Sequence, residues 1–251
     1  MQQGGIRPTR LAARSRGVKT VVLPAPLTMW QYGMMTAVSI RGLVLAGGRS
    51  RRFGGEDKAF IELRGKPLWQ HALSRLAPQV DAIAVSSNDR TGRFTSCLQD
   101  FSGSIRYRTG GTGPATIAVF PDLIAGSLGP LAGIHAGLSA WPECHVATVA
   151  VDLPFIPPNL VERLSAGLDR GRCAYPIDGM RHALALLWAP GSAADLAAFL
   201  GRGGRSVRDW LAEHGDPVWF TAPGDADLFF NINTPADLMV AERRLQDRER
   251  R

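Results

Sequence analysis

Short aliphatic runs alternate with longer amphipathic stretches along most of the chain, beginning at Ile40. Runs of strand length predict strands at residues 40–46, 81–87, 145–151, 183–188 and 218–221. Amphipathic stretches of helix length predict helices at residues 67–77, 130–141, 157–168 and 234–245. This succession is typical of an α/β fold in which helices cover a mostly parallel sheet.

The clearest sequence signals belong to one strand and to the starts of the helices. Residues 146–151 are apolar apart from Thr148, as expected for a central strand that is buried on both faces. Proline is tolerated in the first turn of a helix, and Pro67, Pro157 and Pro235 stand where three of the helices are predicted to begin. Thr234 is predicted to cap the last of them.

The chain has 251 residues with 45% apolar content, enough to bury the core of one α/β domain. Its net charge of +7 is concentrated at the start, because residues 1–40 hold basic residues and no acid. A nucleic-acid-binding face needs basic residues gathered on a folded surface, so a solvated tail explains this charge better. We expect residues 1–38 to be a disordered basic extension or to precede a true start of translation near Met34 or Met35. Residues 39–251 are expected to form the domain.

The remaining composition excludes several classes of protein. Three cysteines without a Cys-x-x-Cys pair, and five histidines without ligand spacing, indicate neither a disulfide framework nor a zinc site. No uninterrupted apolar stretch approaches the ~18 residues of a membrane span. We therefore expect a cytoplasmic protein that binds neither nucleic acid nor membranes.

The sequence Leu-Ala-Gly-Gly-Arg-Ser-Arg-Arg-Phe-Gly-Gly-Glu-Asp-Lys, at residues 45–58, directly follows the first predicted strand. Its glycines allow the backbone to turn tightly and to point consecutive N–H groups at phosphate oxygens. Arg52 and Lys58 would supply positive charge near the same oxygens. The pattern matches neither the P-loop nor the dinucleotide fingerprint, and the alternative interpretation is a flexible basic loop. The coincidence of strand, glycines and terminal Asp-Lys favours a loop that binds a nucleoside triphosphate.

This loop resembles the signature loop of nucleotidyltransferases that activate phosphate-bearing substrates. Four later segments follow in the order seen in the molybdenum cofactor guanylyltransferase family. They are Gly-Lys-Pro-Leu at 65–68, Gly-Pro-Leu-Ala-Gly at 129–133, Val-Asp-Leu-Pro-Phe-Ile-Pro at 151–157 and Phe-Asn-Ile-Asn-Thr-Pro at 230–235. The resemblance covers residues 40–245. It implies a single Rossmann-like, three-layer nucleotidyltransferase fold with a mostly parallel mixed sheet.

The family joins the GMP part of GTP to molybdopterin and releases pyrophosphate, with Mg²⁺ as cofactor. The resemblance implies catalytic roles for Lys58, Arg52 and Asp152, of which Asp152 would bind the metal. It implies a nucleotide-binding set made of Leu45, Ala46, Gly47, Gly48, Lys58, Asn88, Asp122 and Asp152. Asn231 and Asn233 would contact the pterin or the nucleotide. Implied partners are GTP, molybdopterin, and a molybdoenzyme or cofactor-delivery protein.

Asp152 is also a candidate on physical grounds. It follows a buried strand, and ligands of open α/β sheets gather outside the carboxyl ends of the strands. Mg²⁺ commonly needs only one or two carboxylates beside substrate phosphates. The alternative is an aspartate that caps a turn before Pro154, and the same alternative holds for Asp122. Asn231 and Asn233 could instead support the cap of the last helix.

Two rival functions are consistent with the same residues. A related enzyme would use CTP and make the cytosine dinucleotide. A nucleotide-binding module without turnover would lack the lysine or the metal-binding aspartate, and the sequence contains both Lys58 and Asp152.

Overall fold

The computed structural model describes residues 39–47, 53–88, 92–101, 105–108, 117–123, 129–222 and 227–250. The expected basic extension at residues 1–38 therefore lies outside the described residues, as do Gly48 and Arg52 of the glycine-rich loop. Within the described part, no helix combines the length and apolar character needed to cross a membrane.

Seven strands of the described chain form one sheet, and a separate two-stranded hairpin follows the glycine-rich loop. In spatial order the sheet consists of β5 (Ala118–Phe120), β4 (Ala82–Ser86), β1 (Ile40–Leu45), β6 (His145–Ala150), β8 (Ala185–Trp188), β7 (Cys173–Ile177) and β9 (Gly215–Trp219). The small hairpin pairs β2 (Glu62–Leu63) with β3 (Lys66–Pro67). Only β8 opposes the direction of the other six strands, so the sheet is mixed and mostly parallel, as predicted.

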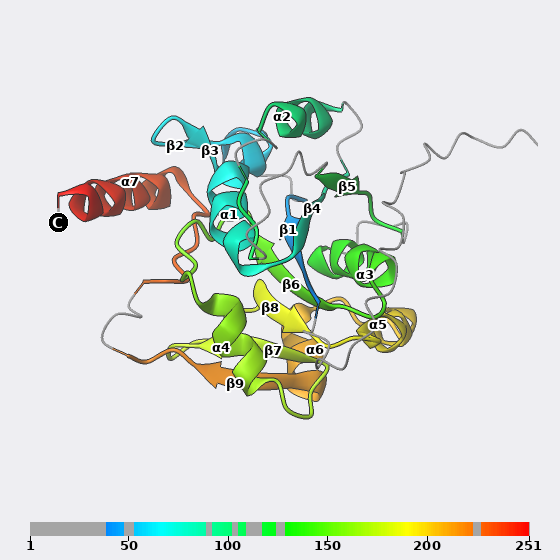
Figure 1. Cartoon of the computed structure of the whole chain (residues 1–251). Helices are drawn as coiled ribbons and strands as arrows, with labels where there is room; N and C mark the ends of the chain where they lie inside the picture. Colours follow the sequence, from blue (N-terminus) through cyan, green and yellow to red (C-terminus); the bar gives the residue numbers. More distant parts are fainter. Residues whose placement is uncertain are drawn as a thin grey trace, which may run out of the picture. The chain divides into compact units, whose positions relative to one another are not determined.

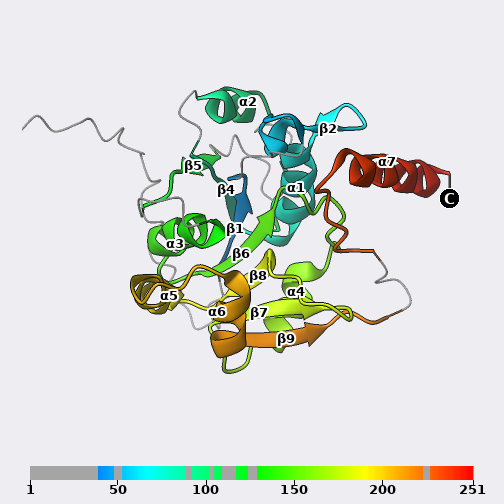
Figure 2. The ribbon, with the colours of Figure 1, turned by 180° about the vertical axis from the view of Figure 1, so that it is seen from behind.

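Helices cover both faces of this sheet, which gives three layers (Figure 1). One face carries α1 (Leu68–Leu76), α2 (Arg93–Phe101) and α4 (Leu160–Gly167), and the other carries α3 (Pro130–Ala140), α5 (Ser192–Gly201) and α6 (Val207–His214). The view from behind shows α3, α5 and α6 together (Figure 2). The last helix of the described residues, α7 (Pro235–Glu249), packs near β2. Two short 3-10 helices of the described residues are η2 (Lys58–Phe60) and η3 (Ala77–Gln79).

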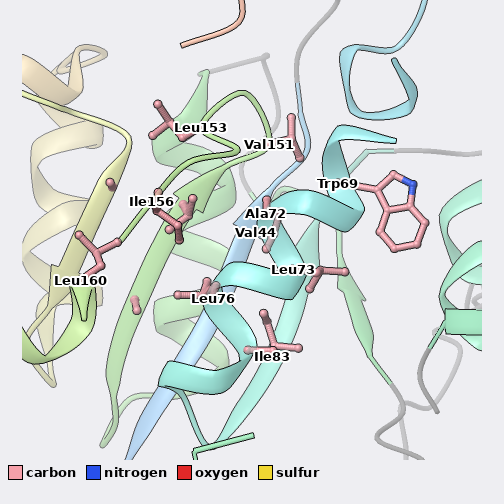
Figure 3. Close-up of a cluster of buried hydrophobic side chains, with 14 of the residues drawn as sticks. Val44, Trp69, Ala72, Leu73, Leu76, Ile83, Val151, Leu153, Ile156 and Leu160 are labelled. Carbon is pink, nitrogen blue, oxygen red and sulfur yellow. The ribbon is translucent and has the colours of Figure 1, made fainter. Parts of the chain in front are cut away.

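The two layers of core follow from the alternation of side chains along each strand. Val44 of β1 faces the α1 side, whereas its neighbours Leu43 and Leu45 face the α3 side. Figure 3 shows Ala72 and Leu76 of α1 next to Val44. Burial on both faces explains the apolar run at residues 43–45 of this strand.

The predicted strands at residues 40–46, 81–87, 145–151 and 183–188 are confirmed as β1, β4, β6 and β8. The helices predicted at 67–77, 130–141 and 234–245 are confirmed as α1, α3 and α7. The last strand was predicted wrongly at 218–221. It is β9, Gly215–Trp219, an edge strand without a fully buried residue, so its apolar pattern is weak.

The helix predicted to begin at Pro157 begins at Leu160 instead. Pro158 disfavours helical backbone at the residue before it, which delays the start. The cap comes from elsewhere in the chain, because the buried side chain of Gln79 accepts a hydrogen bond from the backbone N–H of Val161 at 3.0 Å. The side-chain amide nitrogen of Gln79 also donates a hydrogen bond to the Pro157 carbonyl at 3.0 Å. A glutamine 82 residues away along the chain therefore fixes this end of α4.

Candidate nucleotide-binding site

Four neighbouring parallel strands end at one edge of the sheet. They are β5, β4, β1 and β6, and the residues that follow them carry most of the predicted site. Asp122 follows β5, Asn88 follows β4, Gly47 follows β1 and Asp152 follows β6. The topology therefore gathers residues that are far apart in sequence at the carboxyl edge, where open α/β sheets bind ligands.

A cavity of about 70 Å³ opens at this edge. Five of the predicted residues line it, namely Leu45, Ala46, Gly47, Lys58 and Asp152. The rest of its lining is Pro130, Ala150, Val151 and Leu184. Sequence reasoning assigned no role to Pro130 or Leu184, because each is an ordinary apolar residue whose position depends on how α3 and β8 pack beside β6.

Lys58 is held at the cavity by the turn that carries it. The Asp57 carboxylate accepts a hydrogen bond from the backbone N–H of Ala59 at 3.0 Å and so caps η2. Ala59 is fully buried, which anchors the turn in the core. The Lys58 ammonium then donates to Asp152 Oδ2 at 2.7 Å and to Asn233 Oδ1 at 2.9 Å.

The Lys58–Asp152 ion pair is largely protected from solvent, since the two side chains are 16% and 12% exposed. Ion pairs in such surroundings are screened far less than surface pairs. Asp152 itself is fixed at its backbone, because its carbonyl accepts from the Ile232 N–H at 3.0 Å. Its side chain and main chain thus join the loop after β1 to the segment before α7.

The second carboxylate oxygen of Asp152, Oδ1, is buried and has no hydrogen-bond partner among the described residues. A turn-capping aspartate would accept from a nearby backbone N–H, and this carboxylate receives none from the described chain. Nowhere in the described ranges do three or more His, Cys, Asp or Glu side chains cluster as a metal site. A buried free carboxylate oxygen fits Mg²⁺, which is commonly held by one or two carboxylates together with substrate phosphates.

Asn88 and Asp122 contact each other in a reciprocal pair. The Asn88 amide donates to Asp122 Oδ2 at 2.7 Å, and the Asp122 backbone N–H donates to Asn88 Oδ1 at 2.9 Å. The described lining of the cavity includes neither residue. The structure therefore brings the two together at the ends of β4 and β5, next to the cavity-lining strand β1 rather than in the cavity itself.

Gly133 of α3 packs directly against the end of β4. A Cβ atom at this position would lie 2.2 Å from Ser86 Oγ and 3.5 Å from Asp122 Oδ1. Ser86 is buried, so its side chain has little room to move aside. The absence of a side chain at Gly133 thus allows α3 to approach the Asn88–Asp122 pair.

Replacing Gly133 with alanine is expected to destabilise the fold by about 1–3 kcal/mol, the usual cost of overpacking. Alanine in a helix normally stabilises relative to glycine by ~1 kcal/mol, so the sign of the change reports on the contact. Urea unfolding would measure it. Gly201→Ala, at a helical glycine with nothing within 4 Å, is the matched control and should not destabilise. Adding Ser86→Ala to Gly133→Ala should restore most of the loss, and a lack of restoration would contradict the proposed clash.

The segment before α7 is fixed by a capping box. The Thr234 hydroxyl oxygen accepts from the Asp237 backbone N–H at 3.2 Å, and Asp237 Oδ2 accepts from the backbone N–H groups of Asn233 at 2.9 Å and Thr234 at 2.8 Å. The predicted Thr234 cap is therefore confirmed. Asp237 was missed by the sequence reasoning, although Thr-x-x-Asp ahead of a helix is close to the known capping-box pattern.

These contacts favour the negatively charged form of the Asp237 carboxyl group. The backbone N–H of Asn233, followed by the hydroxyl and backbone N–H of Thr234, lowers the pKa of the Asp237 carboxyl. The side chain of Asn233 takes no part in the box and accepts from Lys58 instead. Asn231 Oδ1 is buried without a partner among the described residues.

The chain is similar to several known proteins. The family described as MobA-like NTP transferase domain matches residues 42–218. The molybdenum cofactor guanylyltransferase of Yersinia pestis (strain Pestoides F) is 38% identical over 208 residues, which cover 82% of this chain and 96% of that protein. The crystal structure of molybdopterin-guanine dinucleotide biosynthesis protein A from Archaeoglobus fulgidus has 25% identity and a TM-score of 0.62, covering 82% of this chain and 99% of that one. A nucleotidyl transferase from Methanothermobacter thermautotroptrophicus, at 20% identity and a TM-score of 0.59, covers 83% of this chain and 99% of its own and shares the fold.

Proposed function

Because the chain belongs to the MobA-like NTP transferase family, we propose that it transfers GMP from GTP to molybdopterin, which carries molybdenum or is metal-free, and releases pyrophosphate. The observation that carries this proposal is the meeting of Lys58 and Asp152 at a cavity lined by the residues that follow β1. The positive charge of Lys58 matches a triphosphate, and the negative charge of Asp152 matches a divalent cation. The 38% identity to a guanylyltransferase over nearly its whole length supports the choice of substrates.

In the proposed reaction the terminal phosphate of molybdopterin attacks the α-phosphorus of GTP, and the bond to pyrophosphate breaks. No nucleophilic side chain is required. Lys58 would bind the β- and γ-phosphates and stabilise the charge that develops on the leaving pyrophosphate. The backbone at Leu45, Ala46 and Gly47 would approach the nucleotide, with Gly48 keeping the turn open and Arg52 adding charge.

Asp152 would hold Mg²⁺ through its free Oδ1. When bound there, Mg²⁺ supplies positive charge to the phosphate oxygens. Asn88 and Asp122 would contact the nucleotide from the ends of β4 and β5, where their mutual hydrogen bonds fix both side chains. Asn231 and Asn233 would contact the pterin or the nucleotide from the segment before α7.

The proposal extends to the surroundings of the enzyme. We include in the proposal the cytoplasmic location expected from the sequence. The dinucleotide product has to reach the enzymes that use it, so we include a molybdoenzyme or a cofactor-delivery protein among the proposed partners.

GTP is expected to support pyrophosphate release at least ~10²-fold better than CTP, ATP or UTP, because a site that hydrogen-bonds one base leaves buried polar groups unpaired with another. The purified protein would be incubated with molybdopterin, Mg²⁺ and each triphosphate in turn. The rate of pyrophosphate release would give kcat/KM, and mass spectrometry would identify the dinucleotide. Equal product from CTP would assign the cytosine dinucleotide instead. Tight binding of GTP without any product would assign a nucleotide-binding module.

A further inference from the structure

A continuous path of hydrogen bonds leads from the first turn of α7 to the cavity. Asp237 Oδ2 accepts from the Asn233 backbone N–H at 2.9 Å, and Asn233 Oδ1 accepts from the Lys58 ammonium at 2.9 Å. Lys58 in turn donates to Asp152 at 2.7 Å. The Lys58–Asn233 contact joins residues 175 apart in sequence, so only the folded chain creates it.

The backbone around Asn233 is fixed on both sides. Before it, Ile232 is fully buried and its N–H donates to the Asp152 carbonyl at 3.0 Å. After it, the N–H of Thr234 donates to Asp237 at 2.8 Å, and the Thr234 hydroxyl donates to the same oxygen at 2.9 Å. These contacts fix the backbone at Asn233, from which its side-chain amide oxygen accepts from Lys58.

Lysine needs such a partner more than most side chains do. Its flexible four-carbon stem has many rotamers, so an unsupported ammonium samples many positions. Asp152 alone fixes it only while that carboxylate is not engaged by a cation. Asn233 is neutral and is not a proposed ligand of the cation, so its Oδ1 can still accept from Lys58 when Asp152 changes partners.

We propose that Asp237 is a positioning residue for the proposed transfer, in which the α7 capping box holds Asn233 and, through it, the Lys58 ammonium. This inference rests on the proposed function. The capping box thus has a second role besides starting α7, because it determines the position of the Lys58 ammonium that would bind phosphate. Small displacements of such a group cost much catalysis, since misplacement by ~1 Å can lower a rate ~10²-fold.

The rival explanation is an ordinary helix cap, and the chain contains a matched control for it. Ser206 caps α6 on the other face of the sheet, where its hydroxyl accepts from the Asp209 backbone N–H at 3.4 Å. Ser206→Ala removes a helix cap without touching the path to Lys58. Asp237→Asn keeps an oxygen acceptor in place of the carboxylate and serves as the conservative variant.

The first measurement is kcat and KM for GTP and molybdopterin with the full chain, together with melting temperatures. Asp237→Ala is expected to lower kcat ~10-fold or more, Asp237→Asn to recover part of that loss, and Ser206→Ala to stay within about twofold of the unmodified protein. In an Asn233→Ala background, Asp237→Ala should cause little further loss, because both act on the same path. Equal kcat for Asp237→Ala and Ser206→Ala at equal loss of melting temperature would reduce Asp237 to a helix cap.

A second measurement needs no substrate and separates the two proposals. The chain has three lysines, Lys19, Lys58 and Lys66, and Lys66 is exposed. Limited acetylation in the presence of Mg²⁺, which would engage Asp152, followed by mass spectrometry gives the rate at Lys58 relative to Lys66. Asp237→Ala should raise this ratio severalfold, and Ser206→Ala should leave it unchanged. A raised ratio in a protein that makes no dinucleotide would keep the positioning inference and reject the proposed reaction, whereas an unchanged ratio would overturn the inference.

Discussion

Replacing Asp152 with asparagine is expected to lower GMP transfer at least ~10²-fold in a protein that still folds. Asparagine preserves size and some hydrogen bonding but removes the charge that pairs with Lys58 and would hold Mg²⁺. The expected size of the loss is that of removing one preorganised electrostatic group from a transition state. Turnover with GTP and molybdopterin over a range of Mg²⁺ concentrations would measure it, and raising Mg²⁺ should rescue it only in part.

Asp81 offers a matched control for this substitution. It lies before β4, at the opposite edge of the sheet, and pairs with Arg108 at 2.8 Å with its side chain 14% exposed, close to the 12% of Asp152. Asp81→Asn should cost stability and leave transfer unchanged. Near-normal transfer by folded Asp152→Asn at ordinary Mg²⁺ would return Asp152 to a structural role and leave the metal without a ligand.

Removing the ammonium of Lys58 is expected to have an effect of similar size. Lys58→Ala should lower kcat/KM for GTP ~10²-fold, because the triphosphate loses a full charge in a protected cavity. Lys58→Arg should restore only part of this loss, since a planar guanidinium does not replace a compact ammonium between Asp152 and Asn233.

GTP affinity from calorimetry and steady-state kinetics would separate binding from turnover in these variants. The exposed Lys66 provides the control, and Lys66→Ala should leave both quantities unchanged. A Lys58→Ala protein with unaltered kcat/KM would remove Lys58 from the phosphate site.

The sequence predicted well those elements whose burial is complete. Strands β1, β4 and β6 are covered on both faces and are therefore mostly apolar, and proline or threonine marks the starts of α1, α3 and α7. Elements with weaker patterns were not predicted, including the three-residue β5 and the strand β7, which contains Pro176. The start of α4 was misplaced because its cap, Gln79, lies 82 residues earlier.

The site was predictable to the extent that each residue follows a strand or belongs to a local motif. Lys58, Asp152 and the residues after β1 fall in this group, and they line one cavity. Contacts between side chains remote in sequence could not be predicted from local patterns. The Asn233 amide reaches Lys58 only because Ile232 pairs with the Asp152 backbone, and the Asn88–Asp122 pair depends on β4 and β5 being neighbours.

The ion pair between Lys58 and Asp152 has a thermodynamic consequence. In the nucleotide-free protein the carboxylate is already neutralised by an ammonium 2.7 Å away, so an external cation has to compete with a charge that belongs to the chain. A triphosphate offers the same ammonium a more highly charged partner. In the proposed function, nucleotide binding would therefore free the carboxylate, and a cation at the carboxylate would free the lysine for the nucleotide. The two affinities would then be linked, and each ligand would strengthen the binding of the other by the same factor.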